Sequence, residues 1–249
     1  MGCPGCVGED IHDIVGIMSR VSTALKWDAI ERAELSVRGS KLQAVPEPTI
    51  AIAPLTVERL PDLATLFGTS RTTSGCYCMW FLQPAKQSQA GWSGGNKLAF
   101  EACAREEQLP MGLLAYLDGQ PVGWCATGPR SRYSRALRSA VLRQRDPAED
   151  DRTWLVPCFF VRTGFRRQGV MRELLTRAVS LAADHGAVAV EGFPLAGDQR
   201  RGNGDAYLGV EPVFAACGFT AVDRPTANRV VMRRDLKRRR RQDSEPPEE

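Results

Sequence analysis

Hydrophobic residues recur along this chain at two spacings, one typical of strands and the other of helices. Apolar runs predict seven strands, at residues 49–53, 112–117, 121–127, 154–161, 187–193, 219–222 and 229–233. Three- and four-residue spacing predicts helices at residues 57–67, 96–107, 172–185 and 210–217. We expect Thr56 to be the N-cap of the first helix, Asp118-Gly119 to form a hairpin turn, and Gly218 to end the last helix. This order predicts an α/β fold, an α+β mixed sheet with helices on both faces.

The two ends of the chain differ from this central part. Residues at helical spacing predict an amphipathic helix near the N-terminus: Ile11, Ile14, Val15, Met18, Val21 and Leu25. A basic block at 237–241 is followed by acidic residues and prolines, which is typical of a disordered tail. We therefore expect an N-terminal, partly helical extension at 1–48, a single domain at 49–236, and a disordered charged tail at 237–249.

Composition narrows the class of protein. The 249 residues are 43% hydrophobic and 25% charged, which is typical of a globular chain. The net charge of +4 is too small to indicate nucleic acid, and no aromatic residue lies within the basic block of the tail. No apolar stretch is long enough to span a bilayer, and the N-terminus lacks the pattern of a secretory signal. We expect a cytoplasmic protein without a membrane partner.

The eight cysteines are scattered, so we expect them to be reduced thiols. Cys3 and Cys6 form a C-x-x-C pair, and Cys76 and Cys78 form a C-x-C pair. A zinc site needs four ligands at matched spacings, and the chain has only two histidines, so we expect no metal. The segment 75–81 around the C-x-C pair is rich in sulfur and aromatic side chains, and its secondary structure is left open.

The most informative segment is a strand, a turn and a helix at residues 154–185. The turn contains Arg166, Arg167 and Gly169, and it opens the predicted helix. The first N–H groups of a helix are unpaired and its dipole favours an anion there. Gly169 permits close approach of a ligand to the backbone, and arginine forks suit phosphate oxygens. The segment therefore predicts a site for a phosphate-bearing cofactor.

The sequence RRQGVM at 166–171 resembles the acyl-CoA-binding motif of the GNAT acetyltransferases, Gln/Arg-x-x-Gly-x-Gly/Ala. Arg166 takes the first place and Gly169 the central place, whereas Met171 departs from the small residue at the last place. The hairpin at 113–128 resembles the second and third strands of that family, and FAACGF at 214–219 resembles its final helix and the following strand. The resemblance covers roughly residues 49–236 and implies the GNAT fold.

The resemblance implies acetyl-CoA as co-substrate. The phosphates would lie against the turn formed by Arg166, Arg167, Gln168, Gly169, Val170 and Met171. Backbone groups of the preceding strand, at Phe160 and Val161, would bind the pantetheine arm and polarise the thioester. In the same family, the segment at 75–81 often shapes the acceptor pocket.

Two residues are candidates for proton transfer. Glu191 interrupts an apolar strand and is a candidate general base, or alternatively a structural carboxylate paired with an arginine. Many family members have a tyrosine acid in the final helix, where this chain has Phe214. Tyr207 could replace it from the preceding loop, but a surface or core tyrosine is the favoured alternative. Many members also have a strand glutamate where this chain has Cys158. Cys158 is either a nucleophile or, more in keeping with its apolar strand, a core thiol.

The resemblance implies an N-acetyltransferase in which an amine attacks the bound thioester directly. The acceptor is a small-molecule or peptide amine, and the oligomeric state is left open, a homodimer included. The alternative is a CoA-binding regulatory or interaction module without turnover, which the departures at Cys158, Met171 and Phe214 favour. Six arginines lie between residues 130 and 145. They form either a solvated surface or a basic rim for an anionic acceptor or the nucleotide of CoA, and we favour the solvated surface.

Overall fold

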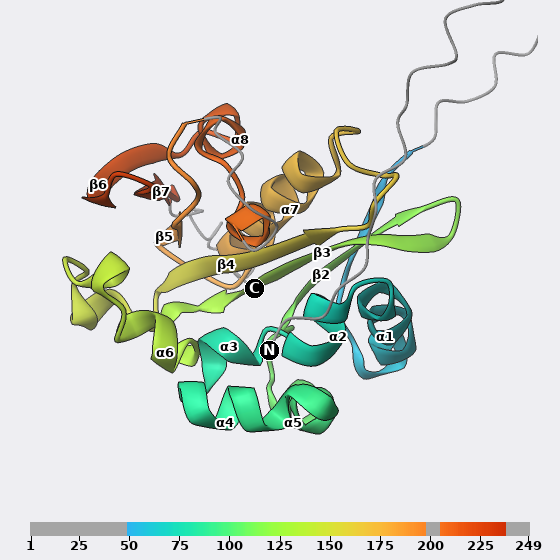
Figure 1. The fold of residues 1–249 in the computed structure, drawn as a ribbon. Coiled ribbons are helices and arrows are strands. Elements are labelled where there is room, and N and C mark those ends of the chain that lie inside the picture. The colour runs from blue at the N-terminus through green and yellow to red at the C-terminus, as the bar shows by residue number, and fades with distance from the viewer. Residues whose placement is uncertain (1–48, 198–204, 238–249) are drawn as a thin grey trace, which may run out of the picture. The chain divides into compact units, whose positions relative to one another are not determined.

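The computed structural model describes residues 49–197 and 205–237, which belong to one compact unit (Figure 1). The helix predicted within 1–48 and the tail beyond Lys237 lie outside the described residues, so both stay predictions. Within 49–197 and 205–237, no helix is both long and apolar enough to cross a membrane.

One mixed sheet forms the centre of this unit. Its strands are β1 (Ala51–Pro54), β2 (Gly112–Leu117), β3 (Gln120–Pro129), β4 (Thr153–Val161), β5 (Ala189–Gly192), β6 (Thr220–Thr226) and β7 (Arg229–Asp235), and their spatial order is β1-β2-β3-β4-β5-β7-β6. Only β4 and β5 are parallel. Asp118 and Gly119 have φ values of 49° and 75°, as a tight hairpin turn between β2 and β3 requires.

Helices cover both faces of the sheet, as predicted (Figure 1). They are α1 (Leu60–Gly68), α2 (Arg71–Cys76), α3 (Met79–Leu82), α4 (Ala85–Ala90), α5 (Gly95–Glu106), α6 (Ser134–Leu137), α7 (Val170–Asp184) and α8 (Glu211–Ala216). The apolar stripe of α7 packs with α8 against one face. The helices α1, α3 and α5 bury a second core against the other face, and α6 covers a smaller cluster there. The predicted fold class is confirmed.

One local prediction needs correction, and the structure also shows the conformation of a segment that the sequence left open. Thr56 makes no side-chain capping bond, because the chain first forms a 3-10 turn at Val57–Arg59 and α1 begins only at Leu60, with Pro61 in its first turn. The segment at 75–81 joins two short helices, α2 and α3. Tyr77 and Cys78, which link them, have left-handed φ values of 45° and 58°.

A bulge lies in β4 near the point where β4 and β5 part, several residues before the predicted cofactor turn. Leu155 pairs with Gly128 and Cys158 with Ala126, so three steps along β4 oppose two along β3. Pro157 lies in this bulge, where its missing N–H costs no ladder bond. The last residue pair between β4 and β5 is Val156 with Gly192, directly before Pro157. Beyond this point one edge of β4 has no strand partner among the described residues.

Candidate functional site

The free edge of β4 presents backbone groups of specific residues. The N–H of Arg162 donates to the Val122 carbonyl at 2.9 Å, which makes this a hydrogen-bonded pair of the antiparallel ladder. Because such pairs alternate, Phe160 also bonds to β3, whereas the backbone N–H and C=O of Phe159 and Val161 point away from it. The geometry thus favours Val161, as predicted, and it favours Phe159 in place of Phe160 for binding a ligand along this edge.

The turn after β4 is built by left-handed residues. Gly164, Arg167 and Gly169 have φ values of 97°, 65° and 81°. The Nε of Arg166 donates to the Val161 carbonyl at 3.1 Å, and the Nε2 of Gln168 donates to the Gly164 carbonyl at 2.9 Å. Arg166 to Gly169 are exposed, so the turn is held by its own hydrogen bonds and stays accessible to a ligand.

The N-terminus of α7 is open toward this turn. Its N-cap, Gly169, has no side chain to cap the first N–H groups, and no atom lies within 4 Å of where a Cβ would be. Val170 is buried and Met171 packs against the core, so both can offer a ligand only their backbone. The open helix end and the charges of Arg166 and Arg167 together suit the phosphates of a CoA-like ligand.

Tyr207 lies on the opposite side of the sheet from α7. It comes from a 3-10 helix at Asp205–Leu208, and its ring stacks on Phe160 with centroids 6.1 Å apart and planes 23° apart. Its hydroxyl is 3.5 Å from the Ser70 hydroxyl, and its side chain is partly buried. The phenol group therefore lies beside the free part of β4, within the same region as the predicted thioester.

The sequence of this region matches a known family. Residues 77–194 match the model of the acetyltransferase (GNAT) family. The resemblance predicted from the sequence is confirmed for this part of the chain. The matched segment contains β2 to β5, the turn at 166–169 and α7, so it includes the open edge and the anion site described above. It does not include Tyr207 or α8. None of the curated proteins compared with the chain matches its sequence.

Solved structures of similar fold include PaiA N-acetyltransferase from Thermoplasma acidophilum in complex with coenzyme A. It is 13% identical, the match covers 76% of this chain and 99% of that chain, and the TM-score is 0.44. YncA from Salmonella typhimurium, solved with its cofactor acetyl-CoA, is 15% identical over 78% of this chain and 98% of that chain, with a TM-score of 0.48. An acetyltransferase from Thermus thermophilus is 16% identical over 76% of this chain and 97% of that chain, with a TM-score of 0.45.

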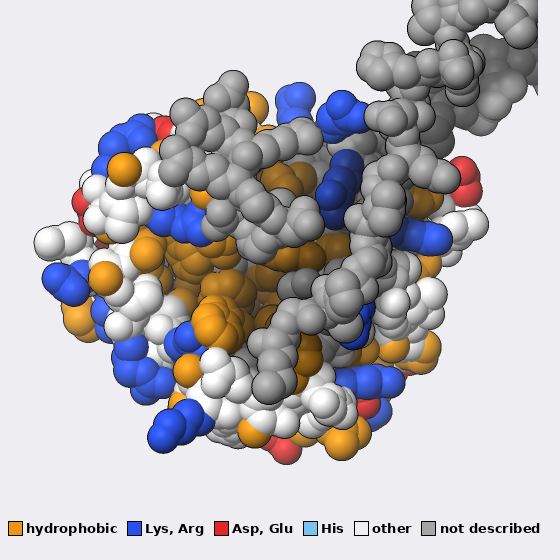
Figure 2. Space-filling model, viewed as in Figure 1, with side chains coloured by type: hydrophobic (Ala, Val, Ile, Leu, Met, Phe, Trp, Pro, Cys, Tyr) orange, Lys and Arg blue, Asp and Glu red, His pale blue; other side chains and the backbone are white. Residues whose placement is uncertain are grey.

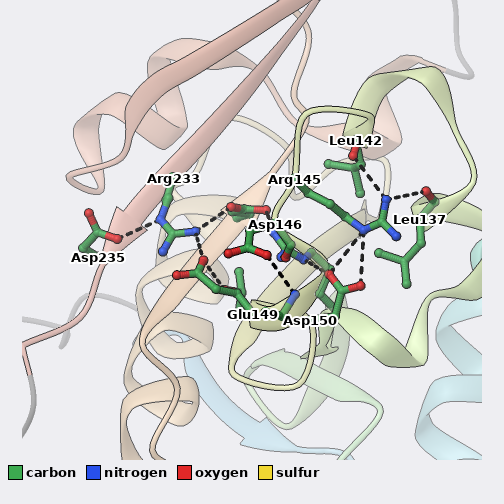
Figure 3. Close-up of polar contacts among 12 residues, drawn as sticks. Leu137, Leu142, Arg145, Asp146, Glu149, Asp150, Arg233 and Asp235 are labelled. Atoms are coloured by element: carbon green, nitrogen blue, oxygen red, sulfur yellow. Dashed lines mark hydrogen bonds and ion pairs between the residues drawn. The ribbon is translucent and has the colours of Figure 1, made fainter.

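Glu191 lies in β5, between two guanidinium groups. Its Oε2 accepts from Nη1 of Arg130 at 2.7 Å and its Oε1 accepts from Nη1 of Arg233 at 2.9 Å. Arg130 also donates to Asp150 at 2.7 Å, and Arg233 donates to Glu149 and Asp235 (Figure 3). Because Glu191 is only 5% exposed and both its oxygens are engaged, the geometry favours the structural alternative over a general base.

This ion-pair network borders a cavity of about 310 Å³ beside β6 and β7. Arg145 and Arg233 line it, but both already pair with carboxylates. Sequence reasoning did not identify Arg130 as the central partner of Glu191. Arg130 is one of six arginines between residues 130 and 145, and no local sequence signal distinguishes it from the other five.

The thiols near β4 have the properties of core groups. A hydrogen bond with Cys78 and then burial raise the pKa of the Cys158 thiol well above its usual range. Burial raises the pKa of the Cys76 thiol to about 11. Both thiols are protonated near neutral pH, and a thiol is a far weaker nucleophile than a thiolate. A covalent acyl intermediate on Cys158 therefore has no support from its surroundings. No cluster suited to a metal occurs in the described ranges.

Proposed function

We propose that this protein is an acyl-CoA-dependent N-acyltransferase that transfers the acetyl group of acetyl-CoA to an amine. The observation that carries the proposal is the continuity of the free edge of β4 with the open N-terminus of α7. Phe159 and the N–H of Val161 offer backbone groups for the pantetheine arm, and the turn at Arg166–Gly169 offers N–H groups and positive charge for the phosphates. A cytoplasmic location remains a prediction.

When bound, acetyl-CoA supplies the thioester whose carbonyl carbon the amine nitrogen attacks as the C–S bond breaks. The backbone N–H of Val161 is the nearest candidate on the free edge to stabilise negative charge on the carbonyl oxygen. Tyr207 would give its phenolic proton to the leaving sulfur, and the proton that the amine nitrogen loses would restore the phenol. Glu191 would hold Arg130 and Arg233 in place rather than accept the proton of the amine, because both of its oxygens already accept from guanidinium groups.

The proposal is tested by incubating the full chain with acetyl-CoA and a panel of primary amines, and by detecting the thiol of released CoA. We expect CoA release that depends on the amine, with an acetylated product of matching mass. Calorimetry of acetyl-CoA without an amine distinguishes an enzyme from the alternative, a CoA-binding module without turnover. Binding without CoA release for any amine would favour a regulatory CoA-binding module, and no binding at millimolar acetyl-CoA would exclude both.

Replacing Tyr207 by Phe is expected to lower kcat by roughly 10- to 100-fold while the affinity for acetyl-CoA is kept. The loss is at or below the lower end of the usual effect of a general acid, because a thiol with a pKa near ~8.5 leaves without full protonation. The affinity is kept because the ring still stacks on Phe160. The measurement is the rate of CoA release at saturating acetyl-CoA.

The matched control is Tyr116→Phe. Tyr116 also has a partly buried hydroxyl, which donates to Asp62 at 2.7 Å, but it lies in β2 away from the free edge of β4. This variant should keep the wild-type rate. If Tyr207→Phe also keeps it from pH 6 to pH 9, the acid role of Tyr207 is wrong.

A further inference from the structure

Arg135 in α6 is a partly buried cation without an anionic partner. Its guanidinium carbon lies 3.4 Å from the ring centroid of Trp80, which is 37% exposed. Its Nη1 is buried and has no hydrogen-bond partner. Within 49–197 and 205–237, no ion pair includes Arg135. A cation–π contact fixes the plane of the guanidinium group, but it does not satisfy a buried N–H donor.

The neighbouring arginines are in a different situation. Arg130 and Arg145 pair with Asp150. The Nε of Arg132 is also buried without a hydrogen-bond partner, but its Nη2 pairs with Glu107. Arg138 and Arg143 are exposed, so water can solvate them. A donor of a charged group that is left buried and unpaired destabilises the protein, so a partner from outside the chain would be stabilising at Arg135.

The position of Arg135 connects it to the acceptor side of the proposed reaction. Its neighbours Tyr133 and Ala136 pack in one cluster with Leu155 of β4 and Phe193, which follows β5. Leu155 is the residue before the last β4–β5 pair, so this cluster lies where the two strands part. The helix α3, which carries Trp80, lies against α6 at this place (Figure 1). Figure 2 shows Lys and Arg side chains beside a central hollow of hydrophobic side chains on this face.

We propose that Arg135 binds a carboxylate of the acceptor, so that the acceptor is a small amine that also carries a carboxylate group. This inference rests on the proposed function. A guanidinium group matches the planar fork of a carboxylate, and stacking on Trp80 holds that fork in one orientation. A phosphate dianion would call for several cations, whereas the other arginines of α6 and its flanking turns are paired or solvated. The hydrophobic side chains exposed on this face suit an apolar side chain on the same molecule.

The test compares amino acids with their primary amides, for phenylalanine, leucine and methionine, in the CoA-release assay. The two members of each pair differ only in the carboxylate. We expect Arg135→Gln to lower the ratio of kcat/KM for the acid to that for the amide by roughly 10- to 100-fold, the usual loss for one charged hydrogen bond. Comparing this ratio between variants cancels the different pKa values of the two amines. Arg135→Lys keeps the charge and should restore part of the ratio.

Arg138→Gln is the matched control, because Arg138 is an exposed cation at the end of the same helix. It should leave the ratio unchanged, and melting temperatures of all variants identify any that fail to fold. If Arg135→Gln acetylates acids and amides in the wild-type ratio, the carboxylate site is refuted while the proposed function stands.

Calorimetry with the same acids and amides tests the site without turnover, so it decides the question even if no amine is acetylated. Binding of the acids that weakens in Arg135→Gln, with the amides unaffected, supports the site although the acetyltransferase function has failed. Equal binding of acids by both proteins, or no binding by either, overturns the site.

Discussion

Replacing Glu191 by Gln is expected to lower the free energy of unfolding by about 3 kcal/mol, the lower end of the loss when one partner of a buried ion pair is removed. The amide oxygen can still accept from one guanidinium group, but the amide NH2 group would face the other one. Arg130 is only 1% exposed, so its charge would lose a partner that water cannot replace. For a domain of this size the melting temperature should fall by roughly 6–12 °C. At temperatures where the variant is folded, its turnover rate should stay within about threefold of wild type.

The matched control for this prediction is Glu149→Gln. Glu149 accepts from the same Nη1 of Arg233 at 2.9 Å, but its side chain is 38% exposed. Because exposed ion pairs contribute about 1 kcal/mol or less, this variant should melt close to wild type. The opposite pattern for Glu191→Gln, an unchanged melting temperature with turnover slowed by about 100-fold or more, would instead assign Glu191 as the general base.

Replacing Gly169 by Leu is expected to weaken the binding of acetyl-CoA by roughly 100-fold, the loss of one or two charge-assisted hydrogen bonds. The leucine side chain would lie over the first N–H groups of α7 and keep the phosphates from the backbone. Calorimetry of acetyl-CoA without an amine measures this directly. The left-handed φ of 81° adds a stability loss of about 1–2 kcal/mol that has no connection with the ligand.

Gly186→Leu separates these two effects. Gly186 follows the other end of α7, has a φ of 73°, and also has no atom within 4 Å of where a Cβ would be. The two variants should therefore lose similar stability, while only Gly169→Leu loses affinity for acetyl-CoA. Equal affinities in the two variants would move the phosphate site away from this turn.

Most of the fold was predictable because its signals are local. The strand and helix periodicities predicted every strand of the sheet and the helices α1, α5, α7 and α8 within a few residues. The segment at 71–90 was not resolved from the sequence, because α2, α3 and α4 have only four to six residues each. Such helices make fewer than two turns, which is too short for a repeating apolar stripe. Tyr77 and Cys78, between α2 and α3, have left-handed φ values, and no glycine in the sequence marks this turn.

The sequence by itself determined the strand, turn and helix at 153–184 and hence the proposed phosphate site, because those contacts join residues close together in the chain. Only the tertiary structure decided which partners the other candidate residues contact. Glu191 is paired with arginines 61 and 42 residues away, and the Tyr207 hydroxyl lies beside a serine 137 residues away. The register of β4 against β3 decided that Phe159 rather than Phe160 has a free backbone. Such pairings depend on how distant strands and helices pack, and local residue spacing does not report that packing.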